Sequence, residues 1–194
     1  MNLVGNVMKN VEKRYSKMRI EWQHYFMLIA KVAATRSGCN SRPTGAVIVE
    51  DKRILCTGFN GTIPGQRQCT DKGSDFCYRR SINGPEDDKY NVCPSVHAEA
   101  NAINQAAKMG ISVDGATMFC TLAPCYVCLK NIKSVGINEV FFELEYKSTN
   151  EKRDKIWSDF CSVGIKGYLL KIPNNVLIDV WNNFLFIDTS KRRL

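Results

Sequence analysis

The feature that most restricts how this chain can fold is a pair of short motifs, His97-Ala98-Glu99 and Pro124-Cys125-Tyr126-Val127-Cys128. His97 lies 28 positions before Cys125, so the fold must bring two distant segments together. An imidazole and two thiolates suit zinc, and three protein ligands leave the fourth tetrahedral position open, as in catalytic sites. Glu99 is then left for proton transfer. The motif pair predicts a hydrolytic zinc site with His97, Cys125 and Cys128 as ligands.

The Cys-x-x-Cys pair taken alone has other interpretations. Such a pair also occurs in redox-active proteins, in half of a structural zinc site, or by chance in a chain with nine cysteines. A redox dithiol needs no histidine and glutamate partner, so the upstream tripeptide favours the hydrolytic site. An isolated glutamate at position 99 would be interpreted as a surface acid in the first turn of a helix.

The composition restricts the number of domains, the location and the class of ligand only broadly. The 194 residues, 44% of them hydrophobic, suffice for one core, and we expect a single domain over 1–194 with its core at about 21–172. Residues 1–15 lack a continuous apolar run, so we expect neither a signal peptide nor a membrane span, and a cytoplasmic location, in the host if the chain is viral. The nine cysteines then indicate metal ligands and reduced thiols. A net charge of +8 is compatible with nucleic acid and with a small phosphorylated substrate.

Hydrophobic periodicity predicts an alternation of helices and strands. Helices are expected at 25–35, 99–109, 125–135, 152–163 and 176–186, and strands at 45–49, 54–58, 116–122, 138–144 and 167–172. The first two strands suit a hairpin of central strands. The ligands fall at two helix starts, where the positive end of the helix dipole favours thiolates. The order of elements predicts an α/β fold, a three-layer α/β/α sandwich around a mixed sheet of about five strands.

Residues 61–96 do not follow this alternation. The segment is rich in Gly, Pro, Asp and Cys, and a loop of this length in a compact domain is usually functional or cross-linked. It carries Cys69, Cys77 and Cys93, and Cys39 precedes the first strand. A closed, cysteine-rich metal site would hold such a segment together in a reducing compartment, and unligated thiols are the alternative.

Together these motifs resemble the deoxycytidylate (dCMP) deaminases, members of the zinc-dependent cytidine and deoxycytidylate deaminase superfamily. H-x-E followed by P-C-x-x-C is the general signature of zinc nucleobase deaminases. The likeness runs from about Glu21 to Ile172, and its other parts are Tyr25–Met27, Arg36-Ser37, Gly45–Val49, Gly58–Gly61, the cysteine-bearing insert and His97–Ile103.

The resemblance implies a cytidine deaminase-like fold and the hydrolysis of dCMP to dUMP and ammonia. Bound zinc lowers the pKa of its water towards ~7. Glu99 would take that proton, deliver it to N3 while C4 is attacked, and assist the departure of ammonia. The resemblance also implies an oligomer, often a hexamer, with dCTP as activator and dTTP as inhibitor, and with Mg²⁺ accompanying an effector nucleotide.

Three residues are candidate substrate contacts by the same resemblance. Asn60 matches a family asparagine that contacts the deoxyribose, Ala98 lies between the metal ligand and the glutamate, and Tyr146 matches a tyrosine near the substrate phosphate. The residues alone leave other interpretations open. Asn60 also suits an Asn-Gly turn, and Tyr146 also suits an ordinary strand end.

The family resemblance also bears on the insert. Some phage and bacterial members carry a structural zinc, and Cys39 and Cys69 match two of its ligand positions. Cys77 and Cys93 are the remaining thiols, so these four cysteines form the hypothetical second site. The chain departs from the family pattern, which supplies a histidine there, because its histidines are His24 and the ligand of the first site.

Rival substrates share the zinc signature. A base in tRNA or single-stranded DNA would suit the basic charge, but minimal nucleic-acid editors lack a cysteine-rich segment like the 36-residue one at 61–96. The sequence also shows no patch of interleaved basic and aromatic residues. A non-catalytic zinc module would tolerate loss of Glu99. We therefore expect dCMP as substrate, without nucleic acid or membrane as partner, and acceptance of dCTP stays an open alternative.

Overall fold

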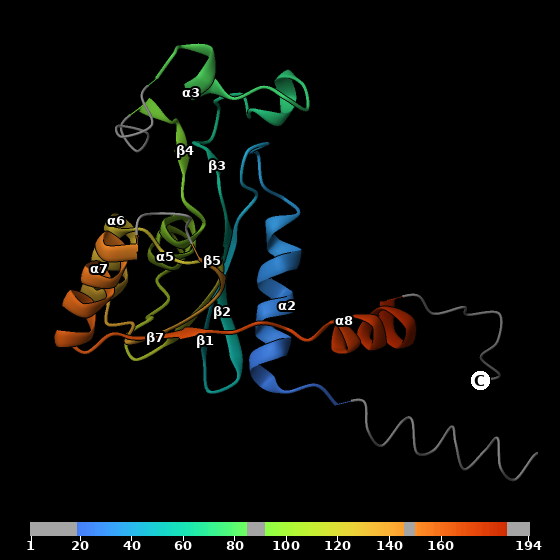
Figure 1. Cartoon of the computed structure of the whole chain (residues 1–194), viewed down its shortest axis with the longest axis vertical. Helices are drawn as coiled ribbons and strands as arrows, with labels where there is room; N and C mark the ends of the chain where they lie inside the picture. Colours follow the sequence, from blue (N-terminus) through green and yellow to red (C-terminus); the bar gives the residue numbers. More distant parts are fainter. Residues whose placement is uncertain (1–18, 85–91, 146–149, 186–194) are drawn as a thin grey trace, which may run out of the picture. The chain divides into compact units, whose positions relative to one another are not determined.

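Residues 19–84, 92–145 and 150–185 are described by the computed structural model of this chain (Figure 1). The chain divides into two units. The larger unit comprises Phe26–Lys171, and the smaller one comprises Met1–Tyr25 together with Ile172–Leu194. Every described candidate site residue belongs to the larger unit. The expectation of a single domain stays a prediction.

A five-stranded mixed sheet, in the order β2-β1-β5-β6-β7, forms the centre of the larger unit. β1 is antiparallel to both β2 and β5, whereas β5, β6 and β7 are parallel to one another. The predicted sheet is confirmed. β2 is nevertheless an edge strand and not a central one, because β5 occupies the other edge of β1. The strands are β1 (Gly45–Glu50), β2 (Arg53–Phe59), β5 (Thr117–Leu122), β6 (Glu139–Leu144) and β7 (Lys166–Leu169).

Helices cover both faces of this sheet, which confirms the predicted three-layer architecture. Figure 1 shows α5, α6 and α7 on one face and α2 on the other. Gly110 ends α5 in the left-handed conformation, with φ at 67°, which glycine adopts without steric cost. The helices are α2 (Trp22–Ala34), whose residues from Phe26 onward belong to the larger unit, α5 (Ala98–Met109), α6 (Tyr126–Ser134) and α7 (Asn150–Ser162).

Two glycines let helices approach the sheet closely. A Cβ atom at Gly45 would lie 2.0 Å from the carbonyl oxygen of Ala30 in α2. A Cβ atom at Gly58 would lie 2.2 Å from the carbonyl oxygen of Ala98, in the first turn of α5. Both distances are far shorter than a van der Waals contact, so only glycine fits. The Gly58 contact fixes β2 against the start of α5, where His97 and Glu99 are located.

The core lies on both sides of the sheet. On the α5 side, Ala98, Ala102 and Ala106 are buried at helical spacing, which lets α5 pack closely on the strands. On the α2 side, aromatic rings form a row across neighbouring elements. The ring centroids are 5.3 Å apart for Phe26 and Phe119, 4.8 Å for Phe119 and Phe141, and 4.7 Å for Phe141 and Tyr168.

The segment 61–96, which we call the insert, contains short elements that lie beyond one end of the sheet (Figure 1). They are β3 (Gly61–Thr62), η1 (Thr70–Lys72), α3 (Tyr78–Ser81) and β4 (Ser95–Val96). β3 and β4 pair in antiparallel fashion, with Gly61 opposite Val96. This pairing closes the insert at its base, directly before His97.

The smaller unit contains the described C-terminal elements. α8 (Asn174–Val180) continues into a π-helical turn, η2 (Trp181–Leu185), and together they account for the helix predicted at 176–186 as far as Leu185. Among the described residues, no helix combines the length and the apolar character needed to span a membrane.

Candidate active site

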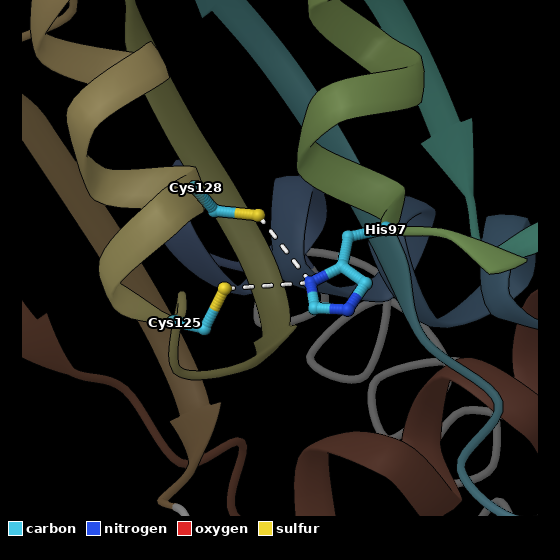
Figure 2. A group of neighbouring side chains, drawn as sticks. All are labelled: His97, Cys125 and Cys128. Atoms are coloured by element: carbon cyan, nitrogen blue, oxygen red, sulfur yellow. Dashed lines mark hydrogen bonds between the residues drawn. The ribbon is translucent and has the colours of Figure 1, made fainter. Parts of the chain in front are cut away.

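Three metal-binding side chains from the two sequence motifs meet in the structure. Candidate ligand atoms of His97, Cys125 and Cys128 lie within 4.8 Å of one another. His97 is the N-cap of α5, Cys125 is the N-cap of α6, and Cys128 follows in α6. Figure 2 shows both sulfur atoms pointing at Nδ1 of His97, at 3.5 Å from Cys125 and 3.4 Å from Cys128. The structure thus brings together the three residues predicted as ligands.

The ionisation of this cluster fits a divalent metal. A hydrogen bond from the Cys128 thiol lowers the pKa of Cys125 to about 4, and the His97 ring lowers it further against the effect of burial. That same hydrogen bond, together with burial, raises the pKa of Cys128 above its usual range. The two thiols are thus coupled, and Cys125 loses its proton more readily than Cys128. One imidazole nitrogen and two sulfurs are a donor set that suits zinc, and binding would release the remaining proton.

Glu99 lies beside this cluster in the first turn of α5 and is only 3% exposed. Burial raises the pKa of Glu99 to about 7, while its own backbone N–H and the charge of His97 act in the opposite direction. A carboxyl group with a pKa near neutrality can both accept and donate a proton under ordinary conditions. The position suits the proton-transfer role predicted for Glu99.

A cavity of about 350 Å³ opens beside Glu99 and His97. Its volume falls within the range of about 300–1,000 Å³ that is usual for small-molecule sites. Ala98 and Asn60, two of the predicted substrate contacts, line it, whereas Tyr146 lies outside the described residues. The lining residues are Cys39, Ser41, Arg42, Thr44, Asn60, Cys77, Arg79, Arg80, Cys93, Ser95, His97, Ala98, Glu99 and Leu122.

Asn60 has a structural task in addition to its place at the cavity. Its Oδ1 accepts hydrogen bonds from the Ser37 hydroxyl at 2.6 Å and the Thr44 backbone N–H at 2.8 Å. Its Nδ2 donates to the backbone carbonyl of Arg42 at 2.9 Å. The side chain is 8% exposed and ties the 37–44 loop to the end of β2. These bonds engage one of the two N–H groups of the amide, and the other is available to a ligand.

The four cysteines predicted as a second metal site have sulfur atoms that are farther apart than the donor atoms of the first site. Among the described residues, no three of Cys39, Cys69, Cys77 and Cys93 have sulfur atoms within 4.8 Å of one another. Burial raises the pKa of Cys93, a backbone N–H of Ser95 opposes this, and the other three thiols raise the pKa further. The electrostatic effect of these three thiols on Cys93 indicates that the four cysteines lie in one neighbourhood. A second metal site stays a prediction.

Cys77 differs from Cys93. Burial acts to raise the pKa of Cys77, but hydrogen bonds from the Arg80 backbone and the Ser41 hydroxyl, with the Arg80 charge, lower it overall. Arg80 also donates from Nη2 to the Ser41 hydroxyl at 3.1 Å. A more acidic thiol is a better metal ligand, because the thiolate is the binding form.

The cavity residues that sequence reasoning missed include Arg79 and Arg80, which α3 brings to the cavity wall. Neither belongs to a motif with a fixed spacing. The available signal was their position two and three residues after Cys77. They lie in the insert, whose end is brought back beside its start, directly before His97, by the pairing of β3 with β4.

Comparison with known proteins decides the family. A profile of the cytidine and deoxycytidylate deaminase zinc-binding region matches residues 20–144. The chain belongs to this deaminase family. The match ends at Leu144, the last residue of β6, so it covers the zinc cluster, Glu99 and the insert.

Individual relatives include proteins named deoxycytidylate deaminase. The chain is 38% identical over 134 residues to ComE operon protein 2 of Bacillus subtilis, which covers 67% of this chain and 63% of that protein. It is 37% identical over 132 residues to the deoxycytidylate deaminase of Mycobacterium phage D29, which covers 66% of this chain and 98% of the phage protein. The chain spans 39% of the length of the deoxycytidylate deaminase of Schizosaccharomyces pombe and 41% of that of Saccharomyces cerevisiae.

A solved deaminase structure has the same fold. The dCMP deaminase of the cyanophage S-TIM5, in complex with dCMP and dUMP, is 27% identical, with a TM-score of 0.60 over 79% of this chain and 99% of that chain. The predicted cytidine deaminase-like fold is confirmed.

Proposed function

We propose that this protein hydrolyses dCMP to dUMP and ammonia. The observation that carries the proposal is the buried carboxyl group of Glu99, which lies beside three zinc-type ligands on the wall of a cavity of about 350 Å³. A metal cluster alone would suit a structural site, whereas a carboxyl with a pKa raised to about 7 is suited to proton transfer. The relatives named deoxycytidylate deaminase, and the cyanophage enzyme bound to dCMP and dUMP, support this substrate.

The mechanism assigns separate tasks to the site residues. His97, Cys125 and Cys128 would hold zinc, which when bound makes water reactive at neutral pH. Glu99 takes a proton from the water that attacks C4 and passes it to N3 of the cytosine ring. It then assists proton delivery to the exocyclic amino group, which leaves as ammonia. Burial of Glu99 keeps bulk water from competing for these protons.

We assign the positioning of the substrate to the three predicted substrate contacts, Asn60, Ala98 and Tyr146. The available N–H of Asn60 suits a hydroxyl of the deoxyribose, while its other bonds keep the 37–44 loop in place. Ala98 is fully buried at the start of α5, so we assign its backbone, and not its methyl group, to the contact with the base. Tyr146 stays a predicted contact with the substrate phosphate.

A second, structural zinc on Cys39, Cys69, Cys77 and Cys93 is part of the proposal. The influence of the other three thiols on Cys93 and the lowered pKa of Cys77 support it. Closure of four thiolates on one ion would draw the insert together, as structural zinc does in small irregular domains.

Assembly and regulation are proposed on the family resemblance. We propose a homo-oligomer, with a hexamer favoured, activation by dCTP and inhibition by dTTP with Mg²⁺, and a cytoplasmic location. Sedimentation would test the hexamer, and rates measured with dCMP plus either triphosphate would test the control.

The deciding experiment measures ammonia release and loss of ultraviolet absorbance by the purified protein. The substrates are dCMP, dCTP, deoxycytidine and a cytosine-containing oligonucleotide, each with the native chain and with Glu99→Gln. Turnover of dCMP that disappears in the variant supports the proposal, and the dCTP arm defines its range. Activity on the oligonucleotide alone would retain the chemistry and overturn the substrate.

A further inference from the structure

The cavity beside Glu99 has an unequal distribution of charge. Arg42, Arg79 and Arg80 line it, and Glu99 is the one acidic residue among the described lining residues. Deamination acts on an uncharged base, so the chemical step itself gives three arginines no task. A negatively charged part of the ligand would give them one.

Two of these arginines come from the insert. Arg79 and Arg80 belong to α3, while Arg42 lies in the loop before β1. Arg80 donates from Nη2 to the Ser41 hydroxyl at 3.1 Å, and Arg79 donates from Nη1 to the Gly84 carbonyl at 3.1 Å. The first bond joins the insert to the loop that carries Arg42, so the three guanidinium groups lie on connected segments of the wall.

We infer that Arg79 and Arg80 make the insert the part of the enzyme that selects a phosphorylated substrate. The inference rests on the proposed function, because dCMP differs from deoxycytidine by a single phosphate group. Guanidinium groups present a planar fork of N–H donors that matches phosphate geometry, and their charge is permanent. An uncharged nucleoside gains nothing from this wall.

The arginines have a competing explanation within the same cavity. Cys39, Cys77 and Cys93 also line it, and the charge of Arg80 helps to lower the pKa of Cys77. Arginines that served only to neutralise thiolates would affect metal retention and the order of the insert. They would not distinguish a nucleotide from a nucleoside.

The test compares Arg79→Gln/Arg80→Gln with the control Arg67→Gln/Lys72→Gln in the full chain loaded with zinc. The control removes the same charge from the same insert, at residues that do not line the cavity. We expect kcat/KM for dCMP to fall about 10- to 100-fold in the arginine variant, a loss of about 1.4–2.8 kcal/mol, which is the usual contribution of one hydrogen bond to a charged group. We expect kcat/KM for deoxycytidine to change less than about threefold. Arg79→Lys/Arg80→Lys should recover part of the loss.

Other outcomes have defined meanings. Equal losses on dCMP and deoxycytidine, or loss of zinc by the variant, would assign the arginines to the structure of the insert and overturn the inference. An unchanged preference for dCMP would overturn it as well. If the native protein turns over neither substrate, the proposed function fails. Calorimetric titration with dUMP and with deoxyuridine then tests the inference by itself, because weakened binding of dUMP alone still supports it.

Discussion

The two cysteine-containing regions of this protein differ in how they are built. In the catalytic cluster, the donor atoms of His97, Cys125 and Cys128 lie within 4.8 Å of one another. In the insert and the loop before β1, no three of the described sulfur atoms of Cys39, Cys69, Cys77 and Cys93 reach that proximity. The first group stands on the N-termini of α5 and α6, whereas the second is spread over loops and elements of four residues or fewer.

The difference shows which interactions position each site. α5 packs on β1 and β2 and contacts α6, so regular elements hold the catalytic ligands near one another. The insert has few buried side chains and little regular structure, so an ion would have to supply much of its order. The following predictions test this contrast from the largest expected effect to the smallest.

Replacement of Glu99 should cause the largest loss. We expect Glu99→Gln to lower kcat for dCMP about 10²- to 10⁴-fold, the usual contribution of a general acid and base. Zinc content and thermal stability should stay near those of the native protein, because the amide occupies the same volume. Glu50→Gln, at the exposed end of β1, is the control. Loss of zinc together with activity would instead show that Glu99 supports the metal site.

Replacement of one cysteine in each region should separate the two metal sites. We expect about two zinc ions per native chain and about one in either Cys125→Ser or Cys77→Ser, measured by atomic absorption. Cys125→Ser should abolish turnover and leave the insert resistant to protease. Cys77→Ser should retain slow turnover while the insert becomes sensitive to protease. Cys161→Ser, an exposed cysteine in α7, is the control. One zinc ion in the native chain would contradict the second site.

Methyl groups added on the two faces of the sheet should have unequal effects on catalysis. Gly45→Ala and Gly58→Ala both place a Cβ near a carbonyl oxygen, at 2.0 Å and 2.2 Å. We expect each to lower the free energy of unfolding by about 1–3 kcal/mol, measured in urea. Only Gly58→Ala displaces the first turn of α5, so only it should also lower kcat. Equal kcat values for the two variants would show that α5 is positioned by other contacts.

The smallest effect is expected at the hydrogen bonds that join Asn60, at the end of β2, to the 37–44 loop. Ser37→Ala removes the hydroxyl that donates to Oδ1 of Asn60, while the bonds of Asn60 with the Thr44 N–H and the Arg42 carbonyl remain. One lost hydrogen bond of this kind corresponds to about 1 kcal/mol, so we expect KM for dCMP to rise several-fold at nearly constant kcat. Steady-state kinetics measures both constants. A fall in kcat without a change in KM would contradict a positioning role.

Much of the fold and the heart of the site could be predicted from the sequence because they depend on local patterns. Helical and strand periodicity marks the main elements to within a few residues, and ligands at helix starts need only short-range spacing. The edge position of β2 was not predictable, because it depends on which strand pairs with β1. Arg79 and Arg80 were missed for a similar reason, since only the folding of the insert brings them to the cavity. The hydrogen bonds of Asn60 likewise join residues that no motif connects.

The contact between Gly58 and the first turn of α5 has a consequence for how such an enzyme can change. His97, Ala98 and Glu99 are consecutive, so the ligand, the candidate base contact and the proton carrier move as one rigid piece clamped on β2. The insert, in contrast, meets that piece at its base and forms a separate stretch of the cavity wall. Substitutions in the insert can therefore alter which molecules enter while the reacting atoms keep their places. The architecture separates the choice of substrate from the chemistry performed on it.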